Sequence, residues 1–168
     1  DVPENWEVSP IKNLSYVNDG NHGEEYPKDS DSASKEDGVP FIRAGDFENF
    51  KIVEDDLRYI SREKNESMRK GNLQENDILF VNRGATIEKV GVIDKNYVGA
   101  NLNSQIAYLR VEETNFNHRY LLYFLSSAFI RETVVAAIMG GALPQYPIKN
   151  IVNLPVCHPQ IEEQRNIA

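Results

Sequence analysis

Short runs of apolar residues, separated by polar and glycine-rich stretches, predict several strands along the chain. The clearest run is Asp77 to Val81, an apolar segment with polar residues and glycine on both sides, as is typical of a buried strand. In Ser104 to Val111 both sets of alternating side chains include apolar groups, which predicts a strand covered on both faces. Three shorter runs are further candidate strands: Val39 to Ala44, Val90 to Ile93 and Ile151 to Val156.

One long helix is predicted between Asn117 and Met139, and Gly140-Gly141 ends its pattern. Its apolar stripe falls at positions i, i+4, i+7 and i+8 and consists of Leu121, Leu125, Ala128 and Phe129. The same spacing predicts that three aromatic side chains are core residues: Tyr123, Phe124 and Phe129.

Two shorter helices and one long loop complete the expected elements. A polar helix is predicted over Ser61 to Lys70, where Ser61 can cap the start and Gly71 can end it. A last helix begins at Pro159 and has acids near its start; because two turns are marginal alone, we expect the parent protein to continue it. Asp19 to Gly38 is almost free of apolar residues and predicts a long loop. The pattern indicates a mixed α/β or α+β fold, with a strongly curved mixed sheet, one long packed helix and a leading stub of spacer helix.

Composition narrows the class of protein. The 168 residues are 40% hydrophobic and 26% charged, which is typical of one folded domain. The single cysteine, Cys157, excludes an intrachain disulfide framework, and no apolar run is long enough for a membrane span. The first residue is Asp1, and no basic and apolar leader follows it, so we expect a processed or excised piece of a cytoplasmic protein.

The net charge of −8 argues against a tight, autonomous DNA binder, since such proteins are usually basic. However, residues 1–60 hold 15 acidic against 6 basic residues, a balance of −9. All of the acidic excess therefore lies in the first third, and the rest of the chain can form a neutral or basic face.

Signatures of enzymes are absent from the sequence. No two glycines stand two positions apart and no Gly-Lys-Ser/Thr occurs, which excludes the usual nucleotide and phosphate loops. No Gly-x-Ser-x-Gly occurs, and no lysine has an acid two positions before it, as many metal-dependent nucleases require. Asp19 and His22 can form an acid–base pair, and a hydrolase or nuclease built on them is one alternative; a polar turn in the loop is another.

A series of segments carries a resemblance to a known family. In order along the chain they are Pro3-Glu4-Asn5-Trp6-Glu7-Val8, Asp19-Gly20-Asn21-His22, Gly38-Val39-Pro40-Phe41-Ile42-Arg43-Ala44-Gly45-Asp46, Leu73 to Gly84, Gly140 to Ile151, and Pro159-Gln160-Ile161-Glu162-Glu163-Gln164. Their order and spacing resemble one target recognition domain of the specificity (S) subunit of a type I restriction–modification system. The resemblance covers nearly the whole chain.

The resemblance implies sequence-specific recognition of double-stranded DNA, without catalysis or a cofactor in this chain. Residues 1–157 would form the recognition domain, and residues 158–168 would begin the spacer helix. Methyltransferase subunits would be the direct partners, and the restriction–translocase subunit would join through them. Three alternatives stay open: the recognition domain of a fused restriction–methylation enzyme, the hydrolase or nuclease above, and an acidic protein-interaction module.

Side chains that can read base edges or hold phosphates are the candidate site. Arginine pairs with guanine, asparagine and glutamine pair with adenine, and glycine lets a backbone approach a phosphate. The candidates are Asn21, His22, Tyr26, Lys28, Arg43, Asn82, Arg83, Gly84, Thr86, Asn103, Gln145 and Tyr146. For Arg43 an ion pair with Asp46 is an equal alternative, and for Asn103, in a polar cluster with Gln105, packing and turn hydrogen bonds compete with DNA contact. Trp6 is expected to be a core or docking residue.

Two segments depart from the family pattern. Glu88 stands where the family often has glycine before Lys89, which leaves a phosphate contact by Lys89 in doubt. The segment after His22 contains Glu24 and Glu25 and is longer and more acidic than usual. Either this loop faces away from phosphates or its acids read cytosine amino groups.

Overall fold

The structure is a computed structural model that describes residues 3–138 and 144–168. Its centre is a four-stranded sheet in the order β2-β10-β7-β8, in which every pair is antiparallel. These strands are β2 (Ser15–Asp19), β7 (Ile78–Val81), β8 (Val90–Val92) and β10 (Ile106–Val111). The two most strongly predicted strands, β7 and β10, are therefore neighbours at the centre of the fold.

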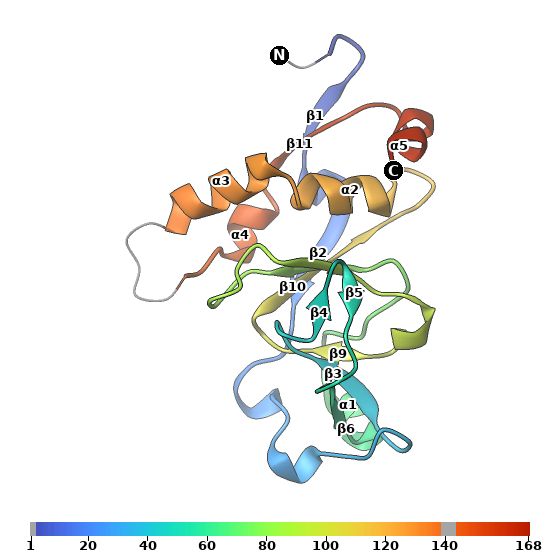
Figure 1. Ribbon diagram of the computed structural model, residues 1–168, viewed down its shortest axis with the longest axis vertical. Coiled ribbons are helices and arrows are strands. Elements are labelled where there is room, and N and C mark those ends of the chain that lie inside the picture. Colours follow the sequence, from blue (N-terminus) through green and yellow to red (C-terminus); the bar gives the residue numbers. More distant parts are fainter. Residues whose placement is uncertain (1–2, 139–143) are drawn as a thin grey trace.

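Both faces of this sheet are covered, as the sequence predicts for Ser104 to Val111. Alternate side chains from β7 and β10 belong to two separate core clusters, with Phe80 and Leu109 in one and Leu79 and Ile106 in the other. All four side chains are 0% exposed. The sheet thus divides the molecule into an upper and a lower layer (Figure 1).

Helices form the upper layer, together with a two-stranded sheet. They are α2 (His118–Leu125), α3 (Ala128–Ile138), α4 (Ile148–Ile151) and α5 (Ile161–Ile167). β1 (Glu7–Pro10) pairs with β11 (Pro155–His158), so the first and last strands lie at the same end of the elongated molecule (Figure 1). Trp6 packs against Tyr120 and its Nε1 donates to Glu163 of α5 at 3.2 Å, in agreement with a docking role.

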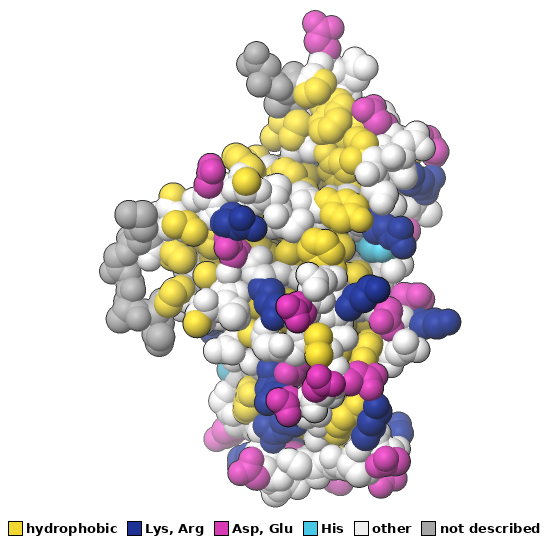
Figure 2. All heavy atoms as spheres, in the orientation of Figure 1, with side chains coloured by type: hydrophobic (Ala, Val, Ile, Leu, Met, Phe, Trp, Pro, Cys, Tyr) yellow, Lys and Arg dark blue, Asp and Glu magenta, His cyan; other side chains and the backbone are white. Residues whose placement is uncertain are grey.

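The lower layer contains most of the acidic first third. A three-stranded sheet has the order β6-β3-β9, in which only β3 and β9 are parallel. Its strands are β3 (Val39–Ile42), β6 (Arg58–Ile60) and β9 (Asn101–Leu102). A small hairpin, β4 (Phe47–Glu48) and β5 (Lys51–Ile52), and the helix α1 (Arg62–Ser67) complete the layer. Figure 2 shows charged side chains of both signs over this half and hydrophobic side chains gathered over the upper half.

Short 3₁₀ turns connect several of these elements. They are η1 (Ile11–Asn13), η2 (Gly23–Glu25), η3 (Asp29–Asp31) and η4 (Lys95–Tyr97). Two of them, η2 and η3, lie in the segment from Asp19 to Gly38, which otherwise forms the long loop that its polar composition predicts. The mixed α/β class is therefore confirmed.

The single helix predicted over Asn117 to Met139 is wrong, because α2 and α3 are separate and bent by 53°. The break falls at two serines whose side chains bind the backbone: Ser126 Oγ donates to Tyr123 O at 2.9 Å, and Ser127 Oγ accepts from Ile130 N at 3.4 Å. The first bond competes with the helical ladder at the end of α2, and the second caps the first turn of α3. Among the described residues, no single helix is long and apolar enough to cross a membrane; only α2 and α3 counted together pass that test.

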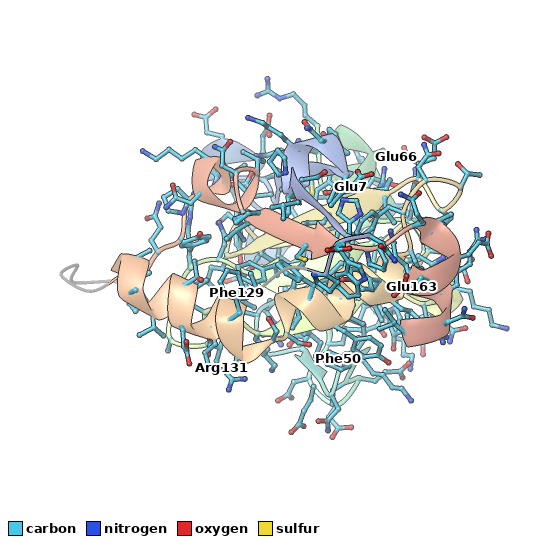
Figure 3. The ribbon with its side chains drawn as sticks, turned by 90° about the horizontal axis from the view of Figure 1, so that it is seen from above. Glu7, Phe50, Glu66, Phe129, Arg131 and Glu163 are labelled. Carbon is cyan, nitrogen blue, oxygen red and sulfur yellow. The ribbon has the colours of Figure 1, made fainter. Side chains whose placement is uncertain are left out.

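The bend also changes which aromatic side chains are buried. Tyr123 is 46% exposed and Phe129 is 53% exposed, so their prediction as core residues is wrong, whereas Phe124 packs partly against the core. Seen from above, Arg131 projects from α3 on the side of the hairpin turn that carries Phe50 (Figure 3). Helical spacing predicts a buried stripe only while one helix axis continues, and here it does not.

Two predicted boundaries also need correction. Ile151 ends the helical turn α4, and the last strand begins only at Pro155, where β1 supplies its partner. Ser61 caps α1 as predicted, since its side chain accepts from Lys64 N, but the helix ends at Ser67 rather than near Gly71.

Candidate DNA interface

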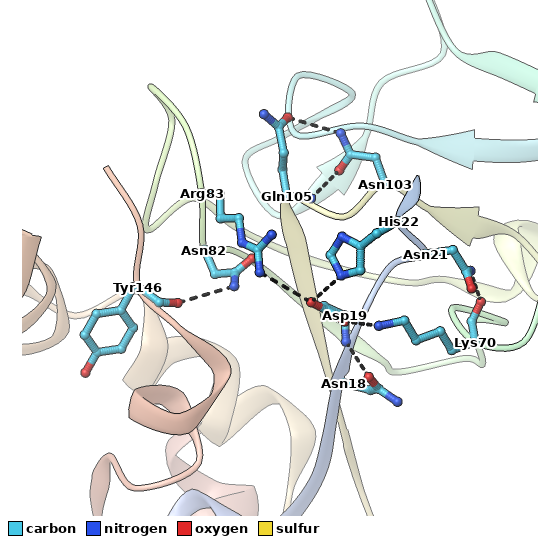
Figure 4. A network of polar contacts seen from close by, with 10 residues as sticks. All are labelled: Asn18, Asp19, Asn21, His22, Lys70, Asn82, Arg83, Asn103, Gln105 and Tyr146. Carbon is cyan, nitrogen blue, oxygen red and sulfur yellow. Dashed lines mark hydrogen bonds and ion pairs between the residues drawn. The ribbon is translucent and has the colours of Figure 1, made fainter. Parts of the chain in front are cut away.

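A buried carboxylate at the end of β2 gathers basic side chains from three segments. Asp19 is 7% exposed, and its Oδ2 lies 3.2 Å from His22 Nε2 and 3.8 Å from Arg83 Nη2. Its Oδ1 accepts a hydrogen bond from Lys70 Nζ. Figure 4 shows the carboxylate between these three side chains. We call Asp19, His22, Lys70 and Arg83 the Asp19 cluster.

The residues after Asp19 explain why the chain turns here. A Cβ at Gly20 would overlap the backbone carbonyls of Leu102 and Asn103, so only glycine permits this close approach. Asn21 then forms a parallel β-bridge with Asn103, and its side-chain amide donates to Lys70 O at 2.5 Å. The Asp-Gly-Asn-His segment therefore brings β2, the turn after α1 and the turn before β10 together.

Arg83 and Gly84 follow the buried strand β7, as predicted. Gly84 has a φ of +99°, and its N–H donates to Pro144 O at 3.0 Å, while Arg83 bridges to Gln145 in antiparallel fashion. The Arg83 side chain is 35% exposed, and its buried Nε has no hydrogen-bond partner among the described residues. Because a third of the side chain is exposed, the outer nitrogens of its guanidinium can donate to an acceptor outside the chain.

Two amide side chains lie beside this arginine. Asn103 Nδ2 donates to Gln105 Oε1 at 3.1 Å, and Asn103 Oδ1 accepts from Gln105 N at 3.2 Å. Asn103 is nearly buried, whereas Gln105 is exposed and its Nε2 lies near Gly84. Asn103 thus orients Gln105, whose amide N–H groups stay available.

A hollow of about 590 Å³ extends this surface towards the lower layer. Asn103, Gln105, Tyr26 and Arg43 are among its lining residues. The structure therefore brings together seven of the predicted site residues around one surface, by direct contact or through this hollow: His22, Tyr26, Arg43, Arg83, Gly84, Asn103 and Gln145.

Three predicted residues are buried instead. Asn82 is 0% exposed and its amide donates to Tyr146 O at 3.3 Å, while Tyr146 is 4% exposed and packs in the upper core. Burial raises the pKa of Tyr146. Asn21 is 1% exposed. In this conformation these side chains brace the backbone of the interface and cannot reach a base, because the folded chain encloses them.

Arg43 lines the hollow but is held in an ion pair, and the remaining two candidates, Lys28 and Thr86, lie elsewhere. Arg43 makes a bidentate ion pair with Asp46, at 2.9 and 3.0 Å, which is the structural alternative that the sequence left open and which raises the pKa of Arg43. Lys28 is exposed beside η3, where its carbonyl accepts from Arg58. Thr86 lines a separate hollow of about 620 Å³ near Arg131.

The atypical acid at position 88 faces away from the Asp19 cluster. Glu88 pairs with Arg131 of α3 at 3.3 Å, and Lys89 Nζ lies 5.2 Å from the centre of the Phe47 ring. Lys89 is thus held against a core aromatic ring.

Sequence reasoning missed two members of this surface, Lys70 and Gln105, and misread a third. Lys70 carries no local signal, because only the fold brings it to Asp19. Gln105 stood in the polar cluster before β10, and no sequence signal separated its exposure from the burial of its neighbour Asn103. Asp19 was considered as an acid–base partner of His22 or as part of a polar turn, and not as the partner of Lys70 and Arg83.

The side chains on this surface supply hydrogen-bond donors and positive charge. In the described part of the chain, no hydrogen bond joins His22 to a Ser, Thr or Cys side chain. Within the same residues, no group of three His, Cys, Asp or Glu side chains can hold a metal ion. The surface instead presents arginine and amide donors, which suit base edges and phosphates.

Comparison with known proteins agrees with this chemistry. The family described as "Type I restriction modification DNA specificity domain" matches residues 3–168. The EcoBI specificity subunit of Escherichia coli is 26% identical over 170 residues, which cover 99% of this chain and 34% of that protein.

Solved structures share the fold. The HsdS subunit from Thermoanaerobacter tengcongensis superposes with a TM-score of 0.72 at 21% identity, over 99% of this chain and 36% of that one. The type IIG restriction endonuclease BpuSI superposes with a TM-score of 0.63 at 12% identity, over 94% and 26%. The chain thus spans about a third of the specificity subunits that it matches. Since the family match extends over nearly every residue, the chain belongs to the family of type I restriction–modification DNA specificity domains.

Proposed function

We propose that this chain is one target recognition domain, which reads part of a double-stranded DNA site on behalf of a methyltransferase. The observation that carries the proposal is the convergence of Arg83, Gln105 and His22 at one surface, from three segments and over a buried framework. Side chains held on strand ends have defined positions, and base reading requires defined positions. We assign the seven residues gathered there, together with Gln105 and Lys70, to the interface.

Most of the affinity is expected to come from phosphate contacts, in part through basic surfaces of a partner. The chain carries a net charge of −8, and several of its basic side chains are already paired, such as Arg43 with Asp46 and Arg110 with Asp77. Phosphate contacts position a protein on the duplex, whereas base contacts select the sequence. This division assigns selection to the present chain and catalysis to other subunits.

The proposal also includes a domain boundary, the partner subunits and the location in the cell. Residues 158–168 are assigned to the start of a spacer helix and residues 1–157 to the recognition domain, with β11 ending at His158. Gln164 anchors the helix, since its side chain accepts from Asn117 N at 3.0 Å and donates to Pro159 O at 2.9 Å. We assign methyltransferase subunits as direct partners, a restriction–translocase subunit as an indirect one, and the cytoplasm as the location.

A selection from randomised duplexes at low salt tests this function. The protein is incubated with the library, with and without a methyltransferase subunit, and the bound DNA is sequenced. Enrichment of a short motif is expected, and Arg83→Ala should relax the preference at one or two positions. Absence of enrichment in both arms would refute DNA recognition and favour an acidic protein-interaction module.

A fused restriction–methylation enzyme is the second candidate, and the superposition on BpuSI favours it as a context for the same fold. The reading of DNA would be the same in both cases. The two contexts differ in whether the methyltransferase belongs to the same polypeptide, and the full-length reading frame decides between them.

A further inference from the structure

The Asp19 cluster contains a charge arrangement that DNA recognition alone does not require. A surface that binds a polyanion gains affinity from cations and loses it from nearby acids. Yet Asp19 lies behind three basic side chains of the proposed interface (Figure 4). The carboxylate is 9% exposed, whereas the side chains of His22, Lys70 and Arg83 are 44%, 28% and 35% exposed.

Burial makes this carboxylate a fixed point. An ionised carboxylate without partners is costly inside a protein, so its cationic neighbours are held to it. Its backbone is fixed as well, because Asp19 pairs with Ala107 of β10 and the next residue, Gly20, packs directly on Leu102 and Asn103. A cation that pairs with Asp19 therefore has a defined position relative to the central sheet.

Arg83 pairs with Asp19 through an ion pair of 3.8 Å, without a hydrogen bond. Among the described residues, Asp19 is the only carboxylate within 4 Å of its guanidinium, and its buried Nε has no partner there. A flexible arginine reaches the nearest phosphate as easily as a base edge. An arginine with one side against a buried acid keeps its planar donor fork in one orientation, as bidentate pairing with guanine requires.

We propose that Asp19 is a positioning residue that determines specificity: its carboxylate orients Arg83 and His22 towards base edges and restrains them and Lys70 from phosphates. The inference rests on the proposed function. Asp19 lowers the affinity for DNA of any sequence and raises the preference for the cognate one. Both effects follow from one buried charge.

Asp19→Asn separates this role from simple support of the fold. The full-length protein, with and without the substitution, is bound to two duplexes over a range of salt concentrations. One duplex has the sequence that the unsubstituted protein selects, and the other has a random sequence. The variant should bind the random duplex at least as tightly as the unsubstituted protein does, with a steeper salt dependence because freed cations reach phosphates. The preference for the selected duplex should fall about tenfold or more, the scale of one lost bidentate base contact.

Coupling to Arg83 supplies a readout that a structural role would not change. In the parent background, Arg83→Gln should lower the preference about tenfold or more. In the Asp19→Asn background the same change should lower it less than about threefold, because the arginine no longer reads a base. If Asp19→Asn does not fold by circular dichroism, Asp19→Glu replaces it in the same cycle, since the charge is kept and its position moves.

Glu162→Gln is the matched control. It removes the same charge from an acid of α5 that pairs with Arg165 at 3.0 Å and is 81% exposed, and it should leave the preference unchanged. A preference retained within about twofold in Asp19→Asn, or equal effects of Arg83→Gln in both backgrounds, would overturn the role of Asp19. If the unsubstituted protein selects no DNA sequence, the proposed function itself is refuted.

Discussion

Asp77→Asn tests whether the acid before β7 supports the fold. Asp77 is 0% exposed and accepts three hydrogen bonds: from Arg110 Nε at 2.7 Å, from Arg110 Nη2 at 2.6 Å and from Gln74 N at 2.7 Å. The same motif that resembles the specificity-subunit family contains this residue, so a role in DNA contact is the competing explanation. The geometry indicates a structural role, because the ion pair joins β10 to the turn before β7.

The expected loss of stability depends on which unpaired charge each substitution leaves in the folded protein. Asparagine keeps one acceptor oxygen but loses the charge, and the Arg110 side chain is 28% exposed and can regain some water. We expect Asp77→Asn to lower the free energy of unfolding by about 3 kcal/mol, near the lower limit for breaking a buried pair. For a chain of this size that corresponds to a Tm lower by about 6–12 °C. Arg110→Met leaves a buried carboxylate and should cost more, about 4 kcal/mol.

Urea unfolding followed by circular dichroism, on both single variants and the double variant, measures the coupling. The double variant should be less destabilised than the sum of the singles by about 1.5 kcal/mol or more, since each single change already breaks the pair. The exposed pair of Glu162 and Arg165 is the control, with an expected coupling below about 0.5 kcal/mol. Additive effects at Asp77 and Arg110 would refute the reasoning.

Three further predictions concern the site, the titration of buried tyrosines and the last helix. Gly20→Ala should cost about 1–3 kcal/mol by urea unfolding, because the new methyl group overlaps backbone carbonyls; an unchanged midpoint would contradict this. Burial raises the pKa of Tyr108 and of Tyr120 to about 12, so the neutral forms favour the fold and stability should fall as pH rises from about 10 through 12. Absorbance at 295 nm follows the titration, and complete ionisation by pH 10.5 in the folded protein would exclude it. Gln164→Ala should cost about 1–3 kcal/mol and speed hydrogen exchange at the Asn117 amide, and equal protection in variant and parent would argue against the contact.

The central sheet shows which strands the local sequence pattern predicts and which it does not. β7 was predicted from a short apolar run bounded by polar residues, and β10 from an alternation with apolar groups on both faces; both patterns have few alternatives to burial. β1, β2 and β9 were not predicted, because their residues are partly exposed or very few and their pairing depends on partners far along the chain. Register with a distant strand is not a property of a short segment.

The helical region shows the opposite case, in which a strong local pattern led to an error. The apolar stripe from Leu121 to Phe129 indicated one helix, yet Ser126 and Ser127 end α2 and start α3. Serines are common in helices, so their presence alone did not predict a break. The bend places α2 and α3 against the sheet at different angles, and the packing that results left Tyr123 and Phe129 exposed.

Sequence alone determined the mixed α/β class, the two central strands, the resemblance to the specificity-subunit family and the list of polar side chains from which a reading surface can be built. Only the tertiary structure decided which of them share that surface. It enclosed Asn82 and Tyr146, exposed Gln105, and brought Lys70 to Asp19 across 51 residues of sequence. The physical reason is that burial of apolar runs is encoded along a segment, whereas the neighbours of a charge are set by how distant segments pack.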